Sequence, residues 1–218
     1  MRRLGYQRYG APGGDTGSVV SPELGRVAPE HVVGVHINGG LAFPNARPED
    51  LVGLSPVERA RLTGAERLRA DGTGYADIQG AQPHTLGLAL NDSPVGQLTW
   101  IVEKFKEWTG PARELPEDAV SLDEILTNVT LYWLTGTGTT SAQLYYENRT
   151  AQPTSTEPSG VPTAVAVFPT DPAIRRILER EHRIVRWSEF DRGGHFAAAE
   201  APDLLVDDIR AFFRTLRS

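Results

Sequence analysis

Apolar positions near both ends of the chain recur at spacings typical of alternating strands and helices. Residues 8–13 lead into a sharp, glycine-rich turn. Apolar or β-branched runs predict strands over residues 31–37 and 161–168, and alternation of apolar and polar residues predicts a strand over residues 183–190. Apolar residues three or four positions apart predict helices over residues 18–24 and 172–181 and from Pro202 onward. The apolar side of that last helix consists of Leu205, Ile209, Phe212, Phe213 and Leu216.

The middle of the chain has a different pattern, which is helical with polar and aromatic positions. Capping boxes at Ser55 and Ser121, each with glutamate three residues later, predict helices to about Ala70 and toward Trp133. Ser93 and the proline after it predict a third helix to Trp108. Strand–helix alternation on both sides of a helical stretch predicts a parallel sheet interrupted by a cap. We therefore assign residues 1–50 and 161–218 to an α/β core and residues 51–160 to the cap.

Composition narrows the range of functions. The chain has 218 residues, of which 39% are hydrophobic, enough for one large domain or one domain with an insertion. Its net charge of -6 argues against nucleic acid or an anionic membrane as a partner. It has no cysteine, which excludes disulfides, thiol catalysis and cysteine metal sites. No apolar run approaches the length of a membrane span, so we expect a cytoplasmic protein.

The first candidate catalytic group lies in the turn Gly13-Gly14-Asp15-Thr16-Gly17. Its glycine spacing is that of a nucleophile elbow, the sharp strand-to-helix turn that holds a nucleophilic serine at the tip of a sheet. Here the central residue is Asp15, and a carboxylate nucleophile displaces a leaving group at carbon to form an ester on the enzyme. By itself the same sequence is also typical of an ordinary glycine-rich turn.

A nucleophile of this kind needs a base and an orienting acid, which follow it in the order acid, then histidine. His195 comes just after a predicted strand, in a glycine-rich loop from which its imidazole can reach a site. The alternative is a loop histidine bonded only to backbone. Asp171 ends the preceding strand and is the candidate acid. Because it stands before proline at a predicted helix start, it is also a good candidate N-cap.

Several separated segments together resemble the microsomal-type epoxide hydrolases of the α/β-hydrolase superfamily, in their bacterial form. One is Val35-His36-Ile37-Asn38, and another, residues 192–198 (Arg-Gly-Gly-His-Phe-Ala-Ala), is among the family's most specific signatures. The others are residues 8–17, 74–79, 90–96, 103–105 and 141–148. The segments span nearly the whole chain in the family's order. The resemblance implies an α/β-hydrolase fold with an inserted, mostly helical cap.

The resemblance also assigns roles. It implies Asp15 as the nucleophile, His195 as the base that activates water, and Asp171 as the acid that orients the imidazole. Tyr75 and Tyr145 match the two cap tyrosines that hydrogen-bond the epoxide oxygen; their alternative role is ordinary packing. Adjacent helical residues point about 100° apart, so Tyr146 is not expected to face the same site as Tyr145. Thr16 replaces the family's usual tryptophan, but its backbone N–H can still serve an oxyanion hole.

The implied reaction converts a small-molecule epoxide to a vicinal diol through a covalent aspartyl ester. It needs no metal or organic cofactor, and the implied biological role is detoxification. Neither nucleic acid nor membrane is an expected partner, and the sequence leaves a homo-oligomer open. The family's upstream His-Gly-x-Pro turn has no counterpart here, because the chain contains no His-Gly pair. On this comparison we expect a truncated, C-terminal portion of such an enzyme, beginning at the helix before the nucleophile strand.

Two alternatives remain open at this point. The first is that the chain is not an active epoxide hydrolase but an impaired or inactive remnant of one, which retains residues it no longer uses. A different carboxylate-nucleophile hydrolase, such as a haloalkane dehalogenase, is the second alternative. Halide capture favours indole or amide donors, which the tyrosine pair does not supply, yet Trp100 and Trp133 lie in the predicted cap.

Overall fold

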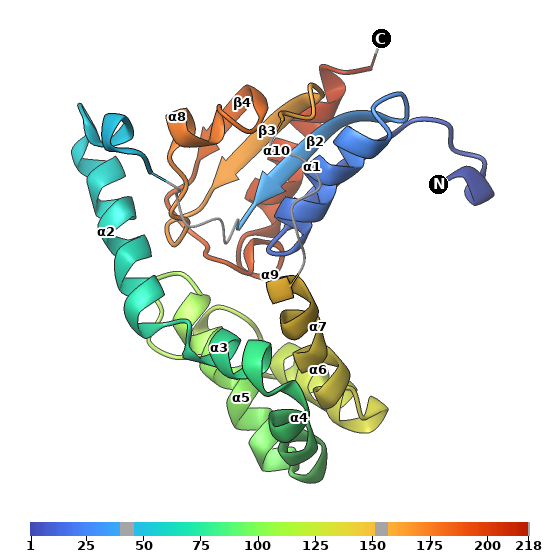
Figure 1. The fold of residues 1–218 in the computed structure, drawn as a ribbon, viewed down its shortest axis with the longest axis vertical. Helices are drawn as coiled ribbons and strands as arrows, with labels where there is room; N and C mark the ends of the chain where they lie inside the picture. The colour runs from blue at the N-terminus through green and yellow to red at the C-terminus, as the bar shows by residue number, and fades with distance from the viewer. Residues whose placement is uncertain (40–45, 151–156, 218) are drawn as a thin grey trace. The chain divides into compact units, whose positions relative to one another are not determined.

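A computed structural model describes residues 1–39, 46–150 and 157–217 (Figure 1). The chain divides by its contacts into two compact units, Met1–Ala65 with Thr156–Ser218, and Glu66–Ser155. Each unit is described by itself below. No helix in the described part of the chain combines the length and the apolar character needed to cross a membrane.

The first unit is built on a four-stranded parallel sheet. Its strands are β1 (Tyr9–Gly14), β2 (Val32–Asn38), β3 (Pro162–Val167) and β4 (Arg183–Glu189), which lie side by side in chain order. Gly14 pairs with Asn38, and Asn38 pairs with Ala166. The carboxyl ends of neighbouring strands are therefore level, so the residues that follow them meet at one edge of the sheet.

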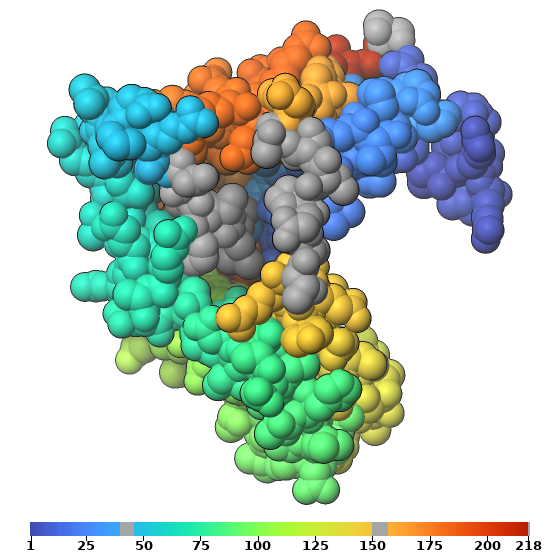
Figure 2. All heavy atoms as spheres, viewed as in Figure 1, coloured from blue at the N-terminus to red at the C-terminus, as the bar shows by residue number. Residues whose placement is uncertain are grey.

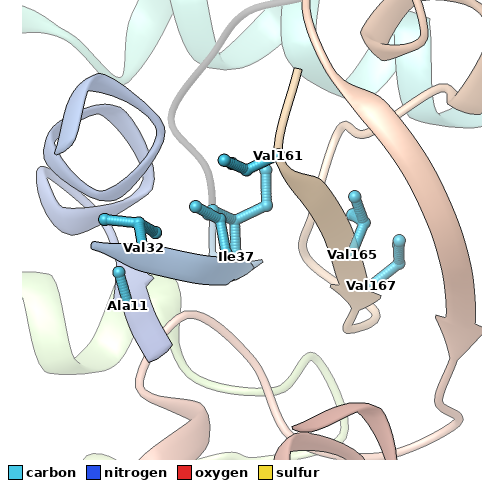
Figure 3. Packing of buried hydrophobic residues seen from close by; sticks show 7 residues of the cluster. Ala11, Val32, Ile37, Val161, Val165 and Val167 are labelled. Carbon is cyan, nitrogen blue, oxygen red and sulfur yellow. The ribbon is translucent and has the colours of Figure 1, made fainter. Parts of the chain in front are cut away.

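Helices cover both faces of this sheet. Apolar residues of one face pack with α1 (Gly17–Val27) and α8 (Arg175–Leu178), and the valines of this layer are drawn in Figure 3. The other face packs against α9 (Ala197–Glu200) and α10 (Pro202–Arg214) through a separate apolar cluster. Successive strand residues point to opposite faces, so Val165 belongs to the first layer and Ala166 to the second. Coverage on both faces explains why the two central strands, β2 and β3, are buried along most of their length and consist mainly of apolar residues.

The second unit is helical, as the sequence predicts. Helix α2 (Pro56–Asp71) enters it and is followed by α3 (Gly74–Ala81), α4 (Pro83–Asp92), α5 (Pro94–Trp108), α6 (Leu122–Thr135) and α7 (Gly138–Thr150). Ser121 and Glu124 form the predicted capping box at the start of α6. The Ser93 hydroxyl accepts a hydrogen bond from the Gly96 N–H at the start of α5, at 3.0 Å.

The first half of α2 belongs to the sheet unit. Its start carries the other predicted capping box, in which the Ser55 N–H donates to Glu58 at 2.8 Å. Leu54 and Leu62 pack against Ile174 and Ile177, so the start of α2 and α8 lie side by side (Figures 1 and 2). These contacts place the division of the chain at Ala65, whereas hydrophobic patterning alone places the start of the cap at residue 51.

One predicted helix is wrong in length. The pattern predicts a helix over residues 172–181, but α8 has only four residues and begins at Arg175, with Ile174 as its N-cap. Asp171 therefore does not cap a helix. Its carboxylate instead accepts a hydrogen bond from the backbone N–H of Phe168 at 2.8 Å, which closes the loop at the end of β3. The helix expected before β1 is a single 3-10 turn, Arg2–Leu4.

Candidate active site

Asp15 occupies a sharp turn between β1 and α1. Its φ angle is 52°, and among the described residues it is the only one other than glycine with positive φ. Side chains with a Cβ atom rarely adopt this conformation, and it persists only where the surroundings enforce it. A Cβ atom on Gly13 would lie 2.1 Å from the carbonyl oxygen of Gly17, so the turn is closed too tightly for any other residue. This geometry is that of the predicted nucleophile elbow.

The turn brings Asp15 to His195, which lies in the loop after β4. Nε2 of His195 is 3.1 Å from Oδ2 of Asp15. Burial acts to raise the pKa of Asp15, but hydrogen bonds from His195 and from the Thr16 backbone N–H outweigh it, and the net shift is downward. Asp15 is therefore a carboxylate at neutral pH, the form that can act as a nucleophile. The side chain of Asp15 is 42% exposed, so a reactant can approach it.

Asp171 lies in the loop that follows β3, at the same edge of the sheet. It is buried, and burial raises the pKa of its carboxyl group to about 6. The Phe168 N–H, the charge of His195 and the Gly39 N–H each oppose that rise. Asp171 is thus close enough to interact electrostatically with His195, and it is ionised above about pH 6.

Gly39 is a site residue that hydrophobic patterning does not reveal. It follows β2 with a φ of 53°, and its carbonyl oxygen accepts a hydrogen bond from the Asp15 N–H at 3.2 Å. A Cβ atom at this position would lie 3.2 Å from the carbonyl oxygen of His195. Gly39 therefore contacts or adjoins all three candidate catalytic residues. The only sequence signal for it is an Asn-Gly pair directly after a buried strand, which also predicts an ordinary turn.

The two cap tyrosines contact each other within the helical unit. The rings of Tyr75, on α3, and Tyr145, on α7, have centroids 5.7 Å apart in an edge-to-face arrangement. Trp108 packs on Tyr75 at 5.2 Å, and Nζ of Lys104 lies 4.7 Å from the centroid of the same ring. Tyr146 is 45% exposed and lines a different surface hollow with His84. The structure therefore groups Tyr75 with Tyr145 rather than with Tyr146.

His36 is the most deeply buried histidine, and its surroundings give it a structural role. Its Nε2 lies 2.9 Å from Oδ2 of Asp208 on α10, and both side chains are almost inaccessible to solvent. The other oxygen of Asp208 accepts hydrogen bonds from Arg186 and Ser188 on β4. Burial would raise the pKa of Asp208, but these donors together lower it to about 2. The cluster ties α10 to β2 and β4.

Comparison with known proteins places this geometry in context. No family model matches the chain. A bacterial protein of Stigmatella aurantiaca, provisionally named an epoxide hydrolase, is 42% identical over the whole chain, which covers 49% of that protein. Epoxide hydrolase 1 of Sus scrofa is 35% identical over 99% of the chain, which covers 53% of it.

Solved structures agree with these relatives. The epoxide hydrolase of Aspergillus niger superposes with a TM-score of 0.85 at 32% identity, over 99% of this chain and 55% of its own. The juvenile hormone epoxide hydrolase of Bombyx mori superposes with a TM-score of 0.78 at 30% identity, over 100% of this chain and 52% of its own. The chain thus spans about half the length of the relatives it matches.

Proposed function

We propose that this chain, which has the α/β-hydrolase fold and is homologous to epoxide hydrolases over about half of their length, carries the catalytic groups of an epoxide hydrolase. The proposed reaction opens an epoxide to a vicinal diol through a covalent ester on Asp15. One observation carries the proposal. A carboxylate, rather than a hydroxyl group, stands at the tip of a strained elbow and is hydrogen-bonded to a histidine.

In the first half-reaction, Oδ of Asp15 attacks a ring carbon of the epoxide, and the bond from that carbon to the epoxide oxygen breaks. The electron pair passes to the oxygen, which becomes an alkoxide and takes a proton. We assign the donors of that proton and of the stabilising hydrogen bonds to Tyr75 and Tyr145. Their ring contact supports the assignment, because it brings both phenols to one place in the helical unit.

In the second half-reaction, His195 removes a proton from water, and the water oxygen attacks the carbonyl carbon of the Asp15 ester. Negative charge then develops on the other oxygen of Asp15. The Thr16 N–H donates to this carboxylate, which supports its assignment as one oxyanion donor. Asp171 stabilises the imidazolium that forms. The bond from the carbonyl carbon to the ester oxygen then breaks, and that oxygen takes the imidazolium proton and leaves as the diol. The second proton of the attacking water returns to the tyrosine that gave up its proton, which restores the Asp15 carboxylate.

A haloalkane dehalogenase would use the same nucleophile but needs donors for the departing halide. The indole N–H of Trp100 already donates to Oε1 of Gln79 within the helical unit, at 3.4 Å. That contact argues against Trp100 as a halide donor and favours the epoxide substrate class.

The proposal is tested by trapping the ester in the His195→Gln variant, because that variant retains the nucleophile and lacks the base. After incubation with an aryl epoxide, intact-protein mass should rise by the mass of one epoxide, and the added mass should map to Asp15. The double variant with Asp15→Asn is the control and should gain nothing. Mass gain from a haloalkane alone, or from neither compound in the folded protein, would contradict the proposal.

A further inference from the structure

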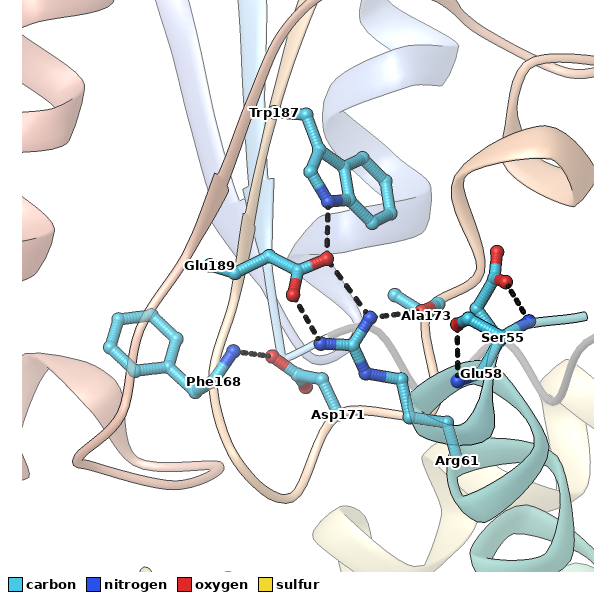
Figure 4. Close-up of polar contacts among 8 residues, drawn as sticks. All are labelled: Ser55, Glu58, Arg61, Phe168, Asp171, Ala173, Trp187 and Glu189. Carbon is cyan, nitrogen blue, oxygen red and sulfur yellow. Dashed lines mark hydrogen bonds and ion pairs between the residues drawn. The ribbon is translucent and has the colours of Figure 1, made fainter.

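Next to Asp171 lies an ion pair for which the proposed mechanism has no role. Arg61, on α2, makes a two-pronged ion pair with Glu189 at the end of β4, with N–O distances of 3.1 and 2.9 Å (Figure 4). The Arg61 side chain is only 16% exposed. Trp187 holds the carboxylate from the other side, with its indole N–H 2.8 Å from Oε1 of Glu189. A bidentate pair of this kind, with two parallel hydrogen bonds between planar groups, has a fixed geometry.

The same guanidinium group also faces the loop of the candidate acid. Nη1 of Arg61 lies 3.4 Å from the carbonyl oxygen of Ala173, two residues after Asp171. Its positive charge also interacts favourably with the Asp171 carboxylate. Figure 4 shows Arg61 between Glu189 and the loop that runs from Phe168 through Asp171 to Ala173. The guanidinium group thus contacts both the loop that carries the acid and the end of the next strand.

Hydrogen bonds at the start of α2 hold Arg61 in place on the sheet unit. The Ser55–Glu58 capping box fixes the start of α2 less than two turns before Arg61. The Arg176 side chain donates to the carbonyl oxygen of Val52 at 2.8 Å, which holds the preceding segment on the sheet unit. The fold of this segment therefore holds Arg61 beside Glu189.

We propose that Arg61, held in place by Glu189, positions the Asp171 loop through the Ala173 carbonyl and sets its positive charge beside the Asp171 carboxylate. The inference rests on the proposed function, in which Asp171 must be ionised to orient His195. Arg61 and Glu189 are positioning residues, because they act on His195 through Asp171. A cavity of about 120 Å³ also adjoins Asp171. Among the described residues, the charges of His195 and Arg61 act on Asp171 directly, and Glu189 lies beyond Arg61. The titratable groups along the cavity are Arg26, Glu181 and His182.

Two substitutions separate this role from simple loop packing. Arg61→Met removes a positive charge near Asp171 and leaves the negative charge of Glu189 without its counter-ion, so the Asp171 pKa should rise by about half a unit to one unit. Glu189→Gln removes a negative charge but keeps an acceptor for Arg61, so the Asp171 pKa should fall by a similar or smaller amount. A role limited to packing predicts no such opposition, because both substitutions weaken the same contact. Arg61→Lys keeps the charge and should stay near the wild-type value.

The readout is the titration of the Asp171 carboxyl carbon by ¹³C NMR in the full 218-residue chain, assigned by its absence in Asp171→Asn. The matched control removes the exposed Arg175–Glu179 ion pair of the same unit. Arg175→Met and Glu179→Gln should leave the Asp171 titration unchanged. Shifts of opposite sign for Arg61→Met and Glu189→Gln support the proposal, and absent or same-sign shifts overturn it. If Arg61→Met does not fold, Glu189→Gln and Arg61→Lys still decide.

This titration does not depend on turnover. Where the Asp15 ester forms in protein that retains His195, the pH midpoint of its hydrolysis should move with the Asp171 pKa in each variant. If wild-type protein forms no ester while the carboxyl titrations still shift in opposite directions, the proposed function fails and the assignment of Arg61 and Glu189 stands. If the ester forms and hydrolyses with no shift in either variant, the positioning role alone is wrong.

Discussion

Nε2 of His195 lies 3.1 Å from Oδ2 of Asp15, although 180 residues separate the two in the chain. The parallel sheet brings them together, because β1 and β4 end at the same edge and the loop after β4 returns over it. The contact places a base beside a nucleophile at the ends of the strands, where open α/β sheets position their ligands.

The backbone of Asp15 should cost the protein stability. At a φ of 52° a residue with a Cβ atom is strained and glycine is not. Asp15→Gly should therefore be more stable than Asp15→Ala, by about 1 kcal/mol in the free energy of unfolding. Urea denaturation of the two variants measures the difference. The matched control is Thr16, whose φ is -53°, and there the glycine variant should be the less stable of the pair. If the glycine variant were the less stable of the pair at both positions, or the more stable at both, a strained elbow would be contradicted.

Asp171 should reduce stability at neutral pH while serving catalysis. Its folded pKa of about 6 lies above the ordinary value of 3.8, so the folded state binds this proton more tightly than the unfolded state. Relative to its ionised form, protonated Asp171 stabilises the folded state. This stabilisation is fully present below about pH 4 and is lost as pH rises through about 6. Asp171→Asn should therefore be more stable than wild type at pH 7 to 8, by about 1 to 3 kcal/mol, and the gain should vanish near pH 4.

With His195 intact, hydrolysis of the Asp15 ester should nevertheless slow in Asp171→Asn, by a hundredfold or more, because the imidazole loses its orienting charge. Thermal unfolding across pH and single-turnover kinetics give the two readouts. A variant that is destabilised by about 1 kcal/mol with unchanged kinetics would instead point to a purely structural aspartate.

Tyr75 and Tyr145 should act on ring opening alone. Each change to phenylalanine removes one donor to the developing alkoxide, so the rate of ester formation should fall by about 10- to 1000-fold. Hydrolysis of the ester should be nearly unaffected, because its oxyanion forms on Asp15. Rapid-quench mass spectrometry separates the two steps. Tyr146→Phe is the control, since Tyr146 lies apart from the Tyr75–Tyr145 contact, and a larger effect there would show that the wrong tyrosine was chosen.

Much of this arrangement could be predicted from the sequence, for identifiable reasons. Apolar runs indicate β2 and β3, alternation of apolar and polar residues indicates β4, and the glycine spacing around Asp15 indicates the elbow that follows β1. The pairing of Asp15 with His195 could be expected from chain order and from the resemblance. The structure supports it with a direct contact.

What could not be predicted depends on contacts between distant segments. Residues 172–181 have helical spacing, but the loop that holds Asp171 leaves only Arg175–Leu178 helical. Gly39 matters because its backbone lies between Asp15 and His195, and a single sequence carries no sign of that. Arg61 has the ordinary pattern of a polar helix position, and only the packing of α2 on the sheet unit reveals its partner.

The central claim is that Asp15 forms a covalent ester, and an isotope experiment tests it most directly. The wild-type protein, in excess over an aryl epoxide, is allowed a single turnover in H₂¹⁸O. Because water attacks the carbonyl carbon of the ester, ¹⁸O should enter the Asp15 carboxylate, and the first diol released should carry only the epoxide oxygen and an unlabelled oxygen from Asp15. Peptide mass spectrometry of the segment containing Asp15 and mass analysis of the diol give both readings. Label found directly in the first diol, with none in Asp15, would contradict the covalent mechanism.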